Sequence, residues 1–77
     1  MNGYSVRDVA DAIARVLAAQ PACADTIEGI QQWWLRPSGI DAPRDVIASA
    51  LELLEMEQHI ERRRVGTREI WRLRRSP

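Results

Sequence analysis

The apolar residues in the first part of the chain repeat with a helical period. Those that share one face are Val6, Val9, Ala10, Ile13, Val16 and Leu17. Apolar side chains spaced three and four residues apart gather on one side of an α-helix. Ser5 can accept a hydrogen bond from a first-turn amide, and Pro21 ends the run. The pattern predicts a helix over residues 6–20.

A second, shorter helix is predicted over residues 26–35. Asp25 is the expected N-cap, and Glu28 follows three residues later, which is close to the capping-box pattern. The buried face would hold Ile27, Ile30 and Trp34. Trp33 lies about 100° around the helix from Trp34, so the two side chains cannot face the same core. We therefore expect Trp34 in the core, and Trp33 either packed within the domain, for example over the hairpin base, or in contact with a partner.

A turn and a third helix follow. Arg36-Pro37-Ser38-Gly39 is predicted to be a turn, because proline moves its predecessor out of the helical region and glycine readily adopts positive φ. The third helix is predicted over residues 42–58, with Pro43 in its first turn, where an amide has no helical partner. Its core stripe consists of Ile47, Ala50, Leu51 and Leu54.

After Gln58 the hydrophobic period changes from 3.6 to 2, which is typical of β-strands. Gly66 interrupts two alternating runs, so an antiparallel hairpin is predicted over residues 59–73. The expected register places Ile60 opposite Leu73, Arg62 opposite Trp71 and Arg64 opposite Glu69. On such a ribbon Arg63 and Arg64 point to opposite faces. Residues 74–77 are predicted to be a frayed tail.

The length of 77 residues favours one domain spanning residues 1–77, mainly α with a C-terminal β-hairpin. No apolar run approaches the ~18–20 residues that span a bilayer. Residues 1–4 lack the basic and then apolar pattern of a signal peptide. We expect a cytoplasmic protein that does not bind membranes.

The stretch Ile47-x-x-Ala50-Leu51-x-x-Leu54-Glu55, then Ile60-x-Arg62, Gly66 and Ile70-Trp71-x-Leu73, carries a resemblance. Over about residues 24–74 the chain resembles the winged helix-turn-helix domain of small bacterial transcriptional regulators. The resemblance implies a three-helix α-α-α-β-β fold whose hairpin is the wing. Where that family commonly ends the third helix with glycine, this chain has Gln58, so the helix exit must differ or be strained.

The resemblance also implies a partner, double-stranded DNA. The third helix would read the major groove, and the wing would grip phosphates. The implied groove-facing positions are Arg44, Asp45, Ala48, Ser49 and Glu52, and the wing-tip positions are Arg63, Arg64, Thr67 and Arg68. Small winged helices often form homodimers through terminal helices, which makes Ala10 and Ala14 candidate interface residues beside Trp33. The competing interpretation is that the first helix is simply part of the core.

The formal net charge is zero, but the charge is divided along the chain. Residues 1–61 carry four arginines against ten carboxylates, a balance of −6. Residues 62–77 carry seven arginines against Glu69 alone, a balance of +6. Such a basic end is typical of a surface that binds a polyanion, which is the favoured interpretation. The alternatives are charge pairing within the domain or between subunits, and a hairpin that is simply solvated.

The predicted third helix is itself acidic. Residues 41–58 hold Arg44 against five carboxylates, a balance of −4, and DNA affinity comes largely from neutralised phosphates. This supports a rival hypothesis, a winged-helix protein-interaction module that docks an acidic protein partner or its own twin. Arginines engaged with Glu52, Glu55 or Glu61 would favour the rival; a continuous positive face would favour DNA.

Enzymatic chemistry is not expected. His59 and Cys23 stand alone, whereas a structural zinc site needs four ligands and a hydrolytic triad needs three cooperating groups. The sequence therefore predicts no catalytic residue, no metal and no cofactor.

Overall fold

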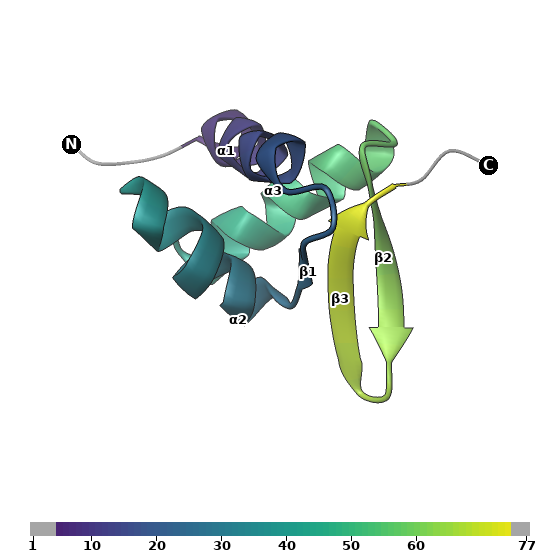
Figure 1. Cartoon of the computed structure of the whole chain (residues 1–77). Helices are drawn as coiled ribbons and strands as arrows, with labels where there is room; N and C mark the ends of the chain where they lie inside the picture. The colour runs from purple at the N-terminus through teal and green to yellow at the C-terminus, as the bar shows by residue number, and fades with distance from the viewer. Residues whose placement is uncertain (1–4, 75–77) are drawn as a thin grey trace.

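The computed structural model describes residues 5–74. The elements in chain order are α1 (Val6–Ala19), β1 (Ala24–Asp25), α2 (Ile27–Gly29), η1 (Ile30–Leu35), η2 (Arg36–Ser38), α3 (Arg44–Met56), β2 (Ile60–Val65) and β3 (Arg68–Leu73). Three helical segments thus precede a C-terminal antiparallel hairpin, in the predicted order. Figure 1 shows the helices gathered together and the hairpin extending beyond them. The predicted tail covers residues 74–77: the Arg74 amide donates a hydrogen bond to the His59 carbonyl at 2.9 Å, and residues 75–77 lie outside the described residues.

Side-chain caps start the first two helices. The Ser5 hydroxyl accepts a hydrogen bond from the Asp8 amide at 3.0 Å, and the Asp8 carboxylate accepts one from the Ser5 amide, as the capping-box pattern requires. The predicted cap of the second helix is wrong by one residue. Thr26, not Asp25, caps α2, because its hydroxyl accepts from the Gly29 amide at 3.2 Å. Asp25 instead belongs to β1.

The second helical segment widens into a π-helix over η1 and ends in the 3-10 turn η2. The Arg36 amide donates to the Gln31 carbonyl, which is the i→i+5 hydrogen bond of a π-helix. Ile30, Trp34 and Leu35 are buried in this segment. Gly39 then adopts φ 82° and ends the segment. The turn predicted at residues 36–39 is therefore present, with its first three residues wound as a 3-10 helix.

The third helix is shorter than predicted at both ends. Pro43 is its N-cap rather than a first-turn residue, and the helix ends at Met56. Gln58 has φ 63°; its amide donates to the Glu55 carbonyl, and the His59 amide donates to the Leu54 carbonyl. These two bonds form a Schellman cap, whose left-handed residue is usually glycine. The strained exit expected at Gln58 is observed.

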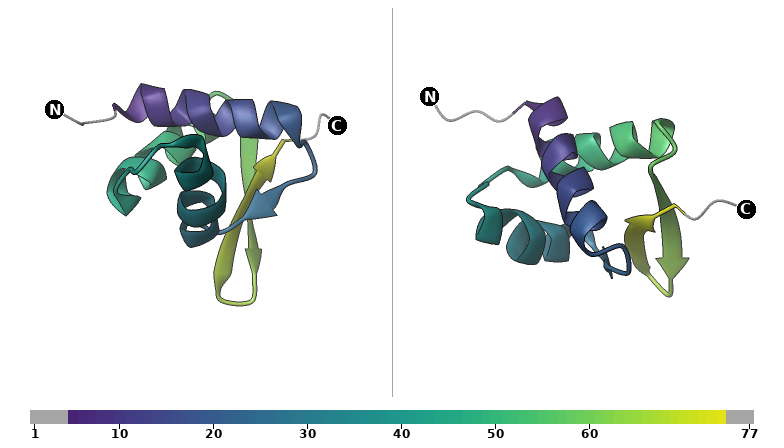
Figure 2. Two further views of the ribbon diagram at one scale, coloured as in Figure 1. Left: turned by 60° about the vertical axis from the view of Figure 1, so that its left-hand side comes forward. Right: turned by 45° about the horizontal axis from the view of Figure 1, so that its top comes forward.

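The sheet has the strand order β1-β3-β2. The hairpin register is the predicted one: Ile60 pairs with Leu73, Arg62 with Trp71 and Arg64 with Glu69. The sequence did not predict β1, which pairs with the other edge of β3, Asp25 opposite Trp71 (Figure 2). The chain between the first two helices is thereby tied to the hairpin.

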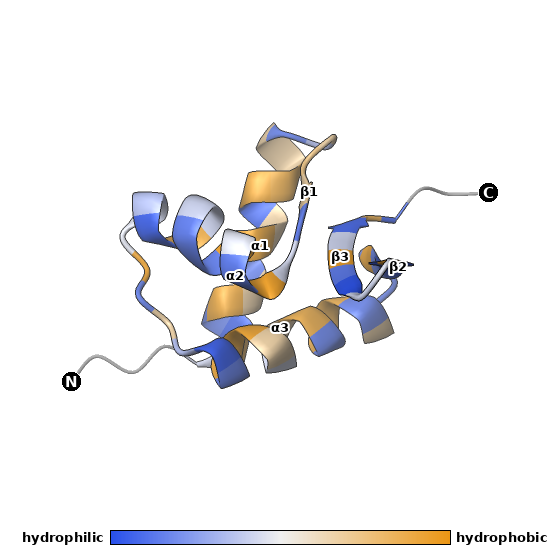
Figure 3. Cartoon of the chain, turned by 90° about the horizontal axis from the view of Figure 1, so that it is seen from below, coloured by the Kyte–Doolittle hydropathy of each residue, from blue (hydrophilic) through white to orange (hydrophobic). Residues whose placement is uncertain are grey.

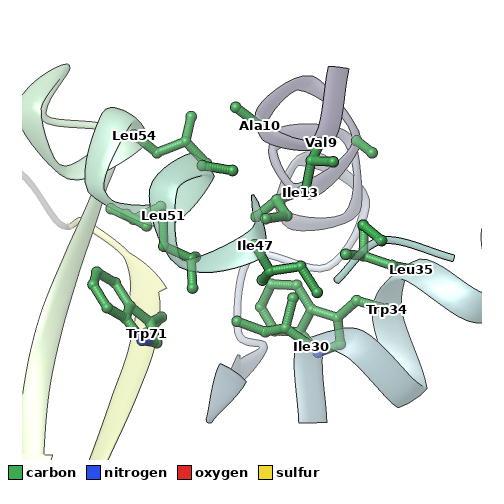
Figure 4. Close-up of a cluster of buried hydrophobic side chains, with 14 of the residues drawn as sticks. Val9, Ala10, Ile13, Ile30, Trp34, Leu35, Ile47, Leu51, Leu54 and Trp71 are labelled. Carbon is green, nitrogen blue, oxygen red and sulfur yellow. The ribbon is translucent and has the colours of Figure 1, made fainter. Parts of the chain in front are cut away.

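One cluster of buried apolar side chains joins all three helical segments to the base of the hairpin. Its larger members are Val9, Ile13, Leu17, Ile30, Trp34, Leu35, Ile47, Leu51, Leu54, Ile60 and Trp71 (Figure 4). The predicted core stripe of α3 and the core position of Trp34 are confirmed. Ala10 is 0% exposed in this cluster, so the prediction that it forms an interface is wrong: small size lets it pack inside its own domain.

Charge also links α1 to the end of α3. The Arg7 guanidinium donates two hydrogen bonds to the Glu57 carboxylate, at 2.9 and 3.2 Å. The hydrogen bond holds the pKa of the Glu57 carboxyl below its usual value. No helix within residues 5–74 is long and apolar enough to cross a bilayer.

Replacing Gln58 with glycine tests the strain at the exit of α3. We expect Gln58→Gly to raise the free energy of unfolding by about 1 kcal/mol, because glycine carries no Cβ penalty at positive φ. That gain corresponds to a melting temperature about 4–8 °C higher for a domain of this size. Gln58→Ala is the control, since alanine keeps the penalty. Equal melting temperatures for the two variants would contradict the strain.

Candidate nucleic-acid interface

An open hollow of about 650 Å³ lies where the N-terminal ends of α2 and α3 meet the tip of the hairpin. Figure 3 views the molecule from the side toward which the hairpin extends. The cationic and hydroxyl side chains of the hollow are Thr26, Arg44, Arg64, Thr67 and Arg68. Four of the predicted DNA-binding residues, from two distant parts of the chain, are thus brought together: Arg44, Arg64, Thr67 and Arg68.

Local structure explains how each of these side chains reaches the hollow. Arg44 is the first residue of α3 and follows the extended Pro43. Gly66 has φ 64°, which lets the chain reverse tightly between β2 and β3. Thr67 and Arg68 follow this turn, and Arg64 lies opposite Glu69 in the ladder. The turn glycine therefore positions the hairpin part of the site.

The electrostatics of the hollow are only mildly positive. Arg44 forms an ion pair with Glu28, and Arg64 Nη2 lies 3.6 Å from Glu69 Oε2. Arg68 has no ion pair with any residue from 5 to 74. The side chains of Arg44 and Arg64 remain 62% and 73% exposed, so an anion can reach them. Three guanidinium groups face two carboxylates, a surplus of one positive charge.

The outward face of α3 does not extend this positive surface. Asp45, Ser49 and Glu52 are exposed, and Ala48 is half-buried. None of the four lines the hollow. Asp45 and Glu52 have no ion pair within the described part of the chain, so their charges are uncompensated by any short contact. The helix predicted to read the groove therefore presents carboxylates, as its sequence suggested.

Arg63 also lies apart from the hollow. Successive residues of a strand alternate between the two faces of a sheet, so Arg63 points away from the face that carries Arg62 and Arg64. It lies opposite Ile70 in the ladder. The prediction that Arg63 and Arg64 point to opposite faces is consistent with this register.

Two further arginines of the basic segment are engaged within the fold. Arg62 Nη2 lies 3.0 Å from Glu55 Oε1, and its guanidinium carbon is 4.9 Å from the centroid of the Trp71 ring. The hydrogen bond to Glu55 raises the pKa of Arg62. Arg72 Nε donates to Glu61 at 2.6 Å. Both pairings were named as signs of the rival hypothesis, although Glu52 takes no part.

Sequence reasoning grouped these arginines with the others. The signal that separates them was present, because the predicted register already placed Arg62 opposite Trp71. An arginine beside an aromatic ring is commonly held by a cation–π contact. Glu55 lies near the end of the predicted third helix, just before the strand that carries Arg62, so it was available as a partner for Arg62. A cross-strand inspection would therefore have assigned Arg62 to the fold.

The remaining candidate interface residues lie elsewhere. Trp33 is 72% exposed, so of the two expectations for it, burial within the domain does not apply. Ala14 is half-buried and lines an apolar groove of about 240 Å³ with Leu17, Ala18 and others. Cys23 donates to the Gln20 side chain. In the stretch from residue 5 to 74, no three His, Cys, Asp or Glu side chains gather as metal ligands.

Alanine substitution separates the arginines that hold the fold from those that are free. We expect Arg62→Ala to lower the free energy of unfolding by about 1 kcal/mol, through loss of the Trp71 contact and the Glu55 pair. Arg63→Ala, next to it in the strand, should change it by less than about 0.5 kcal/mol. Chemical denaturation followed by tryptophan fluorescence measures both. Equal effects would refute the structural role of Arg62.

Comparison of the chain with protein-family models, with curated proteins and with solved structures gives no match. The interpretation of the hollow therefore rests on its own residues and their geometry.

Proposed function

We propose that this chain is a small winged-helix DNA-binding protein that holds the phosphate backbone at the hollow between α2, α3 and the hairpin tip. The observation that carries the proposal is the convergence of Arg44 with Arg64 and Arg68. One guanidinium group can donate two parallel hydrogen bonds to two oxygens of a phosphate, and it stays charged at every physiological pH. Thr26 and Thr67 add hydroxyl donors at the same place.

The order of the elements supports the same proposal. Three helical segments and a basic hairpin follow one another as in the winged helix-turn-helix domains that the sequence resembles. In such a domain a duplex would lie across the start of α3 and the tip of the hairpin. These are the two places from which the arginines of the hollow come.

The proposed complex is weak and depends little on sequence. The arginines can neutralise about three phosphates, and contacts to phosphate carry no direct sequence information. Asp45 and Glu52 on the outward face of α3 would repel the backbone if the helix entered the groove deeply. We therefore expect a dissociation constant on the order of 10⁻⁴–10⁻⁶ M, the range of non-specific binding. A transcriptional regulator of this kind would gain specificity by acting as part of a larger assembly.

A protein-interaction role is the second candidate. The pairing of Arg62 with Glu55 and of Arg72 with Glu61 favours it, and so does the charge of α3. Asp45 and Glu52 are exposed on α3 and have no ion pair among the residues that the structure describes. A surface of this sign would bind a basic partner, not the acidic partner that the basic segment suggested.

Removing the arginines of the hollow tests the DNA proposal. The variant Arg44→Ala/Arg64→Ala/Arg68→Ala should bind a labelled duplex at least about 30-fold more weakly than the unaltered protein, since each lost phosphate contact costs about threefold or more at low salt. Fluorescence anisotropy measures the affinity, and circular dichroism verifies the fold.

The matched control is Arg15→Ala/Arg36→Ala/Arg74→Ala, which removes three exposed arginines outside the hollow. We expect it to weaken binding by less than about threefold, through long-range electrostatics alone. Equal losses in the two triple variants would refute the site. Failure of the unaltered protein to bind duplex DNA at low salt at a concentration of about 10⁻³ M, above the expected range of dissociation constants, would refute the function.

A further inference from the structure

Two surfaces of opposite charge remain outside the hollow. The first, here called the acidic stripe, consists of Asp45, Ser49, Glu52 and Met56 on α3. These residues are spaced four, three and four apart, so they share the side of the helix that faces away from the core. All four are exposed, and the Met56 side chain is 82% exposed. The stripe is an unpartnered helix face with an apolar end.

The second surface, here called the basic face, is the outer side of the hairpin at Arg63 and Val65. These two residues alternate with Arg62 and Arg64 along β2. Ile70 lies opposite Arg63 and Arg68 lies opposite Val65, so Arg68 starts from the same side of the sheet. Val65 is 59% exposed, and Arg63 has no ion pair within residues 5–74. The basic face therefore carries a free cation beside an exposed apolar side chain.

The two surfaces are complementary in charge and in the spacing of their side chains. Among the described residues, three large apolar side chains are exposed, Trp33, Met56 and Val65, and two of them lie on these surfaces. Glu52 and Met56 are separated by about 6 Å along the helix axis. Arg63 and Val65 are separated by about 7 Å along the strand. One contact could thus pair Glu52 with Arg63 while Met56 packs on Val65.

We propose that a second copy of this chain covers both surfaces, forming a two-fold dimer in which the acidic stripe of each protomer docks on the basic face of the other. A two-fold axis requires both halves of the contact on one chain, and this chain carries both. The formal net charge of zero means that two copies do not repel each other overall. Arg68, which lines the hollow, lies opposite Val65 in the ladder, so the contact borders the hollow. Arg44 and Arg64 belong to neither surface, so the dimer can be tested separately from the DNA proposal.

The contact is weak and sensitive to salt. Exposed ion pairs contribute little to affinity and are screened by ions, and each half of the contact buries one apolar pair. We expect a monomer–dimer equilibrium that shifts to monomer when salt is raised.

Charge reversal on one side and then on both tests the dimer. The variants Glu52→Arg and Arg63→Glu each place like charges opposite each other at both halves of a homodimer. Each variant alone should sediment as a monomer of 8.8 kDa at concentrations where the unaltered protein shows dimer. An equimolar mixture of the two should restore the dimer. In the mixed dimer, one half joins the arginine introduced at position 52 to the glutamate introduced at position 63, and the other half joins the unaltered Glu52 to the unaltered Arg63.

Arg15→Glu is the control, since Arg15 is an exposed arginine on α1 outside both surfaces; it should leave the dimer intact. Met56→Ser should reduce dimerisation at every salt concentration, because it removes the apolar half of the contact without changing the charge. A monomeric unaltered protein at low salt, or a mixture that stays monomeric, would overturn the proposal. Loss of DNA binding in an Arg44→Ala/Arg64→Ala variant, which keeps Arg68, together with an intact dimer would support the dimer independently of the DNA proposal.

Discussion

The position of the hairpin base against α3 determines where every candidate functional group lies. Trp71 and Ile60 are buried in the same cluster as Leu51 and Leu54 (Figure 4), and Arg62 bridges the Trp71 ring and Glu55. β1 adds a third strand on the far edge of β3. These contacts fix the hairpin relative to the helix, so Arg64 and Arg68 stand beside Arg44 although the sequence separates them by 20 and 24 residues. Without this packing, the hollow would have no defined shape.

The arginines of the C-terminal segment fall into groups with different structural environments. Arg62 and Arg72 pair with carboxylates and hold the hairpin. Arg64 and Arg68 line the hollow, Arg68 from the tip of the hairpin opposite Val65, whereas Arg63 lies on the outer side of the ribbon and away from the hollow. A strand alternates its side chains, so a run of three consecutive arginines necessarily serves two faces. The zero net charge of the chain conceals both a phosphate-binding hollow and a pair of complementary surfaces in our proposals.

Much of the fold could be predicted because its signals are periodic. The core stripe of α3 and the hairpin register followed from spacings of 3.6 and 2, and even the strained exit at Gln58 was anticipated. The features that the sequence analysis did not predict have no periodic pattern of apolar residues. The strand β1 is two residues long, and the π-helix is a local change of winding that hydrophobic spacing alone does not specify. Ala10 was misassigned because a small residue on a helix fits a tight core and a helix interface equally well. The hollow needed the three-dimensional structure, since its arginines come from the start of α3 and from the hairpin.

The salt dependence of duplex binding tests the central claim most directly, because it counts the phosphates that the protein neutralises. If Arg44, Arg64 and Arg68 each contact one phosphate, the logarithm of the association constant should fall against the logarithm of salt concentration with a slope of about −2.7, or 0.9 per phosphate. A slope steeper than about −5 would mean that arginines outside the hollow also bind phosphates. A slope near zero, or no measurable binding at low salt, would contradict the assignment of the hollow as a phosphate site.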